Sequence, residues 1–126
     1  MSDDAPARAA LVTLIVLQVT MLGALFTQTA PHPPAMVPIA GMGPFLGAAL
    51  SAAAAALVLG PTGSRSGLVT SCLAAALALL SFGPQKWVDP AIAGVWPAVL
   101  TAQIAVVVLA IRMLQAVRHR QAPDAA

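Results

Sequence analysis

Charged residues are scarce in this chain of 126 residues, because six basic and four acidic side chains make up only 8% of the sequence. Soluble domains carry roughly 25% charged residues, and a chain with so few could not keep a globular surface in solution. The net charge of +2 is too small to indicate nucleic-acid binding. With 60% hydrophobic residues, the composition excludes an ordinary soluble domain and indicates a membrane protein.

Cysteine and histidine are equally rare. A lone cysteine, Cys72, excludes an intramolecular disulfide and the Cys-x-x-Cys pair on which the four-helix quinone-coupled thiol oxidoreductases depend. His32 and His119 are predicted on opposite sides of the membrane, so they cannot ligate one haem. A copper site of His32 with Met36 and Met42 is the weakest alternative, because the proline-rich loop around them gives no regular spacing.

Acidic side chains, lysine and histidine are missing from the apolar runs. Proton-coupled transporters need an ionisable residue within the membrane. The small multidrug transporters have four helices and a similar length, and they depend on a glutamate in the first helix, where this chain offers only Gln18. The sequence also holds no nucleophile and base pair, no phosphate loop and no carboxylate pair. We therefore expect a protein that is not an enzyme, with no catalytic, cofactor-binding or metal-binding residue.

Four long apolar runs are present, and they predict transmembrane helices at about 8–28, 39–60, 66–82 and 97–117. About 20 residues at 1.5 Å each cross the ~30 Å hydrocarbon core of a bilayer. The whole chain, 1–126, is predicted as one all-α integral membrane domain with an up-down bundle of four helices. A signal peptide is the rival interpretation of the first run, whose apolar part exceeds the roughly 7–15 residues of such a segment.

Proline and glycine separate these runs. The prolines of residues 31–38 predict a stiff extended loop, and residues 60–67 predict a tight turn that makes the second and third spans a hairpin. Residues 90–96 are expected to form a short interfacial helix before the fourth span, with Pro97 interrupting the path into the membrane. Pro44 either starts the second regular helix or kinks its first turn.

The basic residues predict how the chain is threaded. All five arginines fall on one side of the predicted spans, and the single lysine, Lys86, falls on the other. The positive-inside rule then places both termini and the middle turn in the cytoplasm, with the loop around His32 and the stretch around Trp87 outside. Trp87 and Trp96 are expected to anchor that stretch in the interface. The basic tail, residues 112–120, either signals this topology or attracts anionic lipid at about 1 kcal/mol per charge.

Two rows of small residues predict the faces on which helices pack, because small side chains let backbones approach closely in lipid. The Gly47 row consists of Gly43, Gly47, Ser51 and Ala55. The Gly67 row consists of Gly67, Ser71, Ala74, Ala78 and Ser81. Two glutamines, Gln18 and Gln103, lie at like depth within the spans. They are expected either to hydrogen bond each other, at about 1 kcal/mol, or to face a helix of a partner protein.

These observations lead to one expected function and one alternative. We expect a non-catalytic accessory subunit or assembly factor of a larger complex in a bacterial inner membrane. Energy-transducing complexes are one class of complex that contains such subunits. Its expected partners are membrane lipids and other integral membrane subunits, with no nucleic acid and no identifiable small-molecule substrate. The residues expected to contact a partner from outside are Trp87, Trp96, Lys86 and His32. The alternative is a small homo-oligomeric transporter or channel, lined by Thr13, Gln18, Thr20, Ser51, Ser71 and Gln103.

Overall fold

A computed structural model describes residues 4–27, 39–83, 87–88 and 92–121 of the chain. This part contains four α-helices and no strand, and each helix is long and apolar enough to cross a membrane. The helices are α1 (Ala5–Thr27), α2 (Ile39–Leu59), α3 (Arg65–Phe82) and α4 (Ile92–Gln121). The prediction of an all-helical chain with four candidate spans is confirmed.

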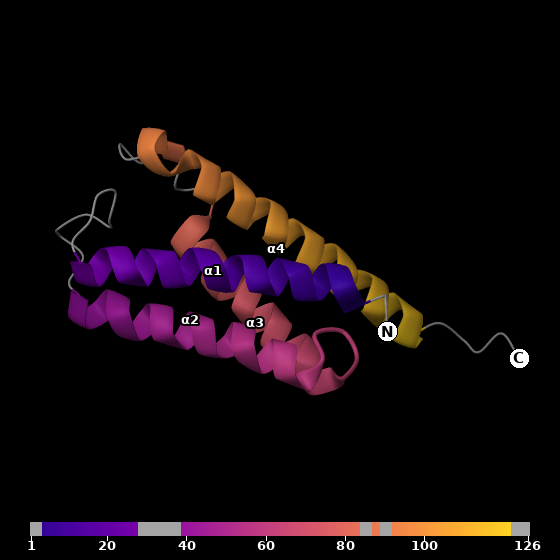
Figure 1. Cartoon of the computed structure of the whole chain (residues 1–126). Helices are drawn as coiled ribbons and strands as arrows, with labels where there is room; N and C mark the ends of the chain where they lie inside the picture. Colours follow the sequence, from indigo (N-terminus) through magenta and orange to yellow (C-terminus); the bar gives the residue numbers. More distant parts are fainter. Residues whose placement is uncertain (1–3, 28–38, 84–86, 89–91, 122–126) are drawn as a thin grey trace, which may run out of the picture.

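The four helices form a ring in which each packs against its neighbours in sequence. α1 contacts α2 and α4, α3 also contacts α2 and α4, and α1 and α3 lie diagonally with little contact. In Figure 1 the first turn of α1, the α2–α3 turn and the last turn of α4 lie at the same end of the bundle. Since successive helices alternate in direction, the bundle has up-down topology.

The core between the helices consists mainly of alanine and leucine, with Phe82, Val99 and Val106. Leu11 and Leu14 of α1, Leu46 of α2 and Leu109 of α4 are fully buried. The buried aliphatic side chains of α3 are all alanines, among them Ala78. Because alanine allows close approach of backbones, α3 presents a surface on which α2 and α4 can pack closely. The buried side chains of the described bundle are apolar apart from Gln18, Ser71 and Ser81.

The expected interruption at Pro97 is wrong for the described residues. α4 runs without a break from Ile92 to Gln121, so residues 92–96 are its first turn and not a separate interfacial helix. Pro97 is the sixth residue of α4, as Pro44 is of α2, and both stand inside their helices. A proline this early removes one hydrogen bond, to the second residue of the helix, and most of the helix keeps its ladder.

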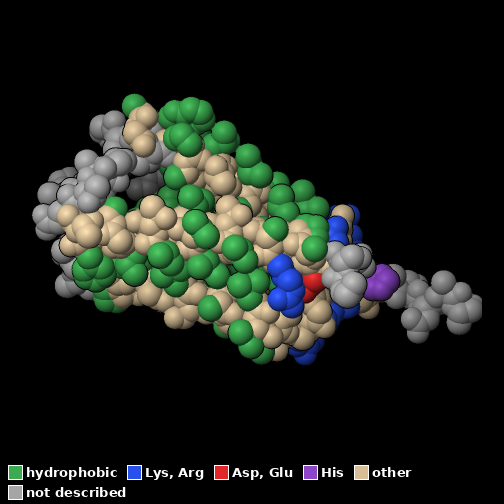
Figure 2. All heavy atoms as spheres, in the orientation of Figure 1, with side chains coloured by type: hydrophobic (Ala, Val, Ile, Leu, Met, Phe, Trp, Pro, Cys, Tyr) green, Lys and Arg blue, Asp and Glu red, His purple; other side chains and the backbone are tan. Residues whose placement is uncertain are grey.

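Most hydroxyl groups of the described helices donate to a carbonyl of their own helix. The donors to the carbonyl four residues earlier, at 2.6 to 3.1 Å, are Thr13, Thr20, Thr27, Ser51, Thr70, Ser81 and Thr101. Such bonds remove the need for a partner from outside the helix. On the face drawn in Figure 2, apolar side chains are spread along the sides of the bundle, between the tan areas of backbone and other side chains.

Candidate functional site

Charged side chains of the described chain gather at one end of the bundle. On the face drawn in Figure 2, the arginine, aspartate and histidine atoms all lie at the end where α1 begins and α4 ends. We call this the basic end, and its arginines are Arg8, Arg65, Arg112, Arg118 and Arg120.

A polar clamp ties the start of α1 to the end of α2. Asp4 Oδ2 lies 3.5 Å from Arg8 Nε, and Arg8 Nη1 donates to the carbonyl of Leu57 at 3.1 Å. The hydroxyl of Thr62, in the α2–α3 turn, donates to Asp4 Oδ1. An arginine on the last carbonyls of a helix also interacts favourably with the helix dipole. The ion pair is about half exposed on the arginine side, so its main effect is to position these chain segments.

The α2–α3 turn has a geometry that only glycine fits at two positions. Gly60 follows α2 with φ of 89°, and Gly63 N donates to its carbonyl at 3.3 Å. Ser64 caps α3, since its Oγ accepts from Gly67 N at 3.0 Å and donates to Leu59 O at 3.0 Å. A Cβ on Gly67 would lie 1.7 Å from the carbonyl oxygen of Gly60, which excludes any side chain there.

All five residues of the Gly67 row are buried in the bundle. Ser71 is fully buried, and its hydroxyl donates to the carbonyl of Pro61 at 3.0 Å, which joins α3 to the preceding turn. In this row the predicted small-residue surface coincides with the face that α3 turns toward the other helices.

The Gly47 row lies on the opposite side of its helix from the bundle. The buried residues of α2 include Ala49 and Ala53, which stand two positions, or about 200°, away from Gly47 and Ser51 on a helix of 3.6 residues per turn. Ser51 is exposed, and a Cβ on Gly47 would meet nothing within 4 Å. Of the two glycines in the row, Gly43 has a neighbour, since a Cβ there would lie 3.7 Å from Phe26 Cζ. Within the chain, α2 therefore packs through a different face from the predicted one.

The two glutamines do not hydrogen bond each other. Gln103 is paired with the α3–α4 connection, since its Oε1 accepts from Trp87 Nε1 at 3.1 Å and its Nε2 donates to the carbonyl of Phe82 at 3.1 Å. Gln18 is buried, with 1% of its surface exposed, and its Oε1 has no hydrogen-bond partner. The proposed Gln18–Gln103 pair is thus replaced by a link from α4 to the end of α3, because the indole of Trp87 and the last carbonyl of α3 both lie within reach of Gln103.

The other residues singled out from the sequence are placed as follows. Trp87 and Trp96 are 43% and 48% exposed at the far end of the bundle from the arginines. His32 and Lys86 lie outside the described residues. Cys72 is exposed on α3.

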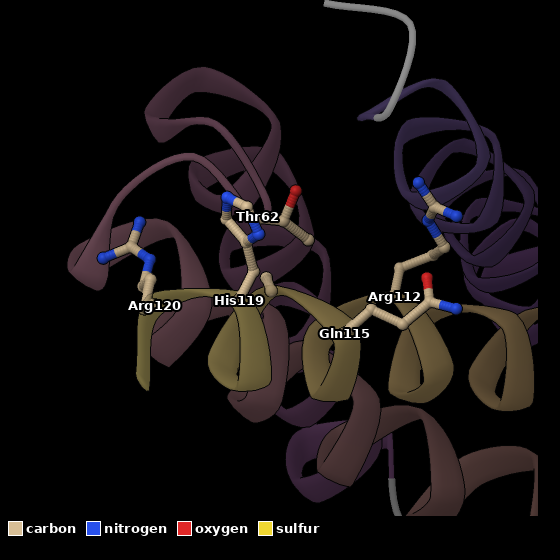
Figure 3. Close-up of a pocket in the computed structure, with 6 residues that line it drawn as sticks. Thr62, Arg112, Gln115, His119 and Arg120 are labelled. Atoms are coloured by element: carbon tan, nitrogen blue, oxygen red, sulfur yellow. The ribbon is translucent and has the colours of Figure 1, made fainter. Parts of the chain in front are cut away.

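A cavity of about 540 Å³ opens at the basic end, between the α2–α3 turn and the last turns of α4. It is lined by Thr62 from the turn and by Arg112, Gln115, Ala116, His119 and Arg120 from α4. Figure 3 shows the imidazole of His119 directed toward Thr62, with the two arginines at opposite ends of the row. We call it the basic-end cavity. Its α4 residues follow the i, i+3, i+4, i+7, i+8 spacing of one helix face, a signal that was present in the sequence.

No group of three histidine, cysteine, aspartate or glutamate residues within the described ranges could hold a metal ion. Comparison with known proteins adds no further assignment. The chain matches no protein-family model, and no curated protein and no solved structure is significantly similar to it.

Proposed function

We propose that this protein is a non-catalytic, multi-pass subunit or assembly factor of a larger membrane complex, in a bacterial inner membrane. The observation that carries the proposal is the Gly47 row. It is a smooth helix face that the chain's own helices leave uncovered at Gly47 and Ser51. Surfaces of this kind allow close packing of a second transmembrane helix, which makes a helix of another subunit the expected occupant.

The polar groups of the bundle support a structural role over a transport pathway. Of the residues named for a channel, Thr13, Thr20 and Ser51 donate to carbonyls of their own helices. Ser71 and Gln103 are bonded to the backbone of the α2–α3 turn and of α3. A pathway for a polar solute needs groups that can bind the solute in place of water. Five of the six residues named for a channel already have protein partners, and Gln18, whose Oε1 has none, is buried with 1% of its surface exposed.

Co-purification tests the proposal. The protein, tagged and extracted from its native membrane in mild detergent, is expected to run with a larger assembly of fixed stoichiometry, identified by mass spectrometry. Gly47→Leu is expected to reduce that co-purification at least fivefold, because a bulky side chain on the Gly47 row prevents close helix approach. A protein that runs alone as a monomer would contradict the proposal, and a pure homo-oligomer would favour the transporter or channel.

Gly23→Leu is the matched control for this variant. Gly23 is also a helical glycine at which a Cβ would meet nothing within 4 Å, but it lies on α1. The control is expected to co-purify like the unmodified protein. Equal losses for both variants would show that any added bulk on the lipid-facing surface disturbs the assembly, and the Gly47 row would then have no special part in it.

The proposed orientation places the basic end in the cytoplasm. Its basis is the positive-inside rule, applied to the arginines that the bundle collects at one end. A cysteine-free variant, Cys72→Ala, with a new cysteine introduced at Ser66 is expected to resist a membrane-impermeant maleimide in intact cells and to react after lysis. Labelling of Ser66→Cys in intact cells would reverse the orientation.

A further inference from the structure

The basic-end cavity has the composition of an anion site. Its lining includes the guanidinium groups of Arg112 and Arg120, the imidazole of His119 and the amide of Gln115. These groups supply hydrogen-bond donors, and the guanidinium groups suit the oxygen atoms of a phosphate in particular. A volume of about 540 Å³ is within the range of sites for small ligands.

The one described carboxylate at the basic end is already paired. Asp4 is the one carboxylate side chain among the described residues, and it does not line the cavity. It forms an ion pair with Arg8 and accepts a hydrogen bond from Thr62. The Thr62 hydroxyl is therefore directed at Asp4, and the nitrogen donors of the lining belong to α4. Among the described residues that line the cavity, two are arginines and none is a carboxylate.

The position of the cavity matches the depth of lipid headgroups. α4 has 30 residues and is about 45 Å long at 1.5 Å per residue, which exceeds the ~30 Å hydrocarbon core. Its last turns, which carry the cavity residues, consequently extend past the hydrocarbon into the headgroup layer or the water beyond it. Anionic phosphate groups occur there both on phospholipids and as free solutes.

We propose that the basic-end cavity binds a phosphate group, held by Arg112 and Arg120 with His119 and Gln115 beside it. The ligand is a phosphate-bearing anion, either the headgroup of an anionic phospholipid or a soluble phosphate. This differs from general attraction of a basic tail to the membrane surface, because it requires the residues that line the cavity and not merely their charge. The proposal is independent of the partner subunit proposed above.

A pair of arginine variants separates a site from general attraction. Binding of phosphatidylglycerol to the purified full chain in maltoside detergent is counted by native mass spectrometry. Arg120→Gln is expected to weaken binding about fivefold, because it removes guanidinium donors that line the cavity. Arg118→Gln removes the same charge from the same helix end, at an exposed residue outside the cavity, and is expected to change binding less than twofold.

A second pair adds a charge instead of removing one. Gln115→Glu places a carboxylate in the cavity and is expected to weaken binding at least fivefold, whereas Gln121→Glu, at the last residue of α4, is expected to change it less than twofold. All four positions are on the exposed end of the helix, and an unchanged thermal unfolding midpoint verifies folding. Equal effects within either pair, or no effect of Arg120→Gln and Gln115→Glu, would overturn the proposal.

The source of the phosphate is determined by repeating the series with inorganic phosphate, measured by calorimetry. If the cavity variants weaken the binding of inorganic phosphate, the ligand is a soluble phosphate. If they weaken the binding of phosphatidylglycerol and inorganic phosphate does not bind, the ligand is a lipid headgroup. If neither probe binds the unmodified protein, the cavity is not a phosphate site.

Discussion

The Gly47 row on α2 and the Gly67 row on α3 look alike in the sequence, yet they face in opposite directions in the structure. All of the Gly67 row is buried, whereas Gly47 and Ser51 point away from the bundle. The difference arises from the α2–α3 turn, where the carbonyl of Gly60 lies so close to Gly67 that this face of α3 must turn inward. A row of small residues thus marks a surface that can pack closely, and the turn determines what the surface packs against.

The largest expected effect is the difference in stability between alanine substitutions at Gly67 and at Gly47. Gly67→Ala is expected to destabilise the protein by about 3 kcal/mol, because the new Cβ would overlap backbone that cannot move freely. Gly47→Ala meets open space and is expected to be neutral or to stabilise by up to about 1 kcal/mol through helix propensity. Unfolding of the detergent-solubilised variants in SDS, followed by circular dichroism, measures both.

Equal effects of the two alanine substitutions would break the comparison, because they would mean that the Gly60 and Gly67 backbones are not in contact. A loss at Gly47 alone would instead indicate that the bundle packs through the Gly47 row. The monomeric state of both variants is verified by size exclusion, so that a change in association is not counted as a change in folding.

A smaller difference in stability is expected between alanine substitutions at Ser71 and at Ser51. Ser71→Ala removes the donor to the carbonyl of Pro61 in a fully buried position and is expected to cost about 1 kcal/mol. Ser51→Ala removes an exposed hydroxyl bonded to its own helix and is expected to stay within about 0.5 kcal/mol of the unmodified protein. The same SDS unfolding measurement applies. A cost at Ser51 as large as at Ser71 would contradict the assignment of buried and exposed faces.

The helices could be predicted from the sequence because length and apolar composition are local properties. α1, α2 and α3 follow the predicted ranges closely. The continuation of α4 through Pro97 could not be predicted, because the cost of a proline depends on how early it stands in its helix, and the start of α4 was not marked by an apolar run. The packing face of α2 escaped prediction because small residues occur all around this helix and spacing alone does not select among them.

The polar contacts between helices were the least predictable part. Gln18 and Gln103 have like depths, but depth does not give rotation about the helix axis, and Gln103 pairs with Trp87 and Phe82. The basic-end cavity depends on Thr62 facing α4 across the bundle, which no pattern within one helix can reveal. Only the face of α4 that lines the cavity could be predicted from the sequence, through the helical spacing of Arg112, His119 and Arg120.

The bonded hydroxyls have a consequence for how favourably the helices partition into lipid. α3 is the least apolar of the four candidate spans. Its hydroxyls at Thr70, Ser71 and Ser81 each donate to a backbone carbonyl within the α2–α3 hairpin. Transfer scales assign a cost to each such residue as if its hydroxyl had to leave water without a partner. For this hairpin that cost is largely cancelled, so its transfer free energy into the bilayer is more favourable than the sum over its residues.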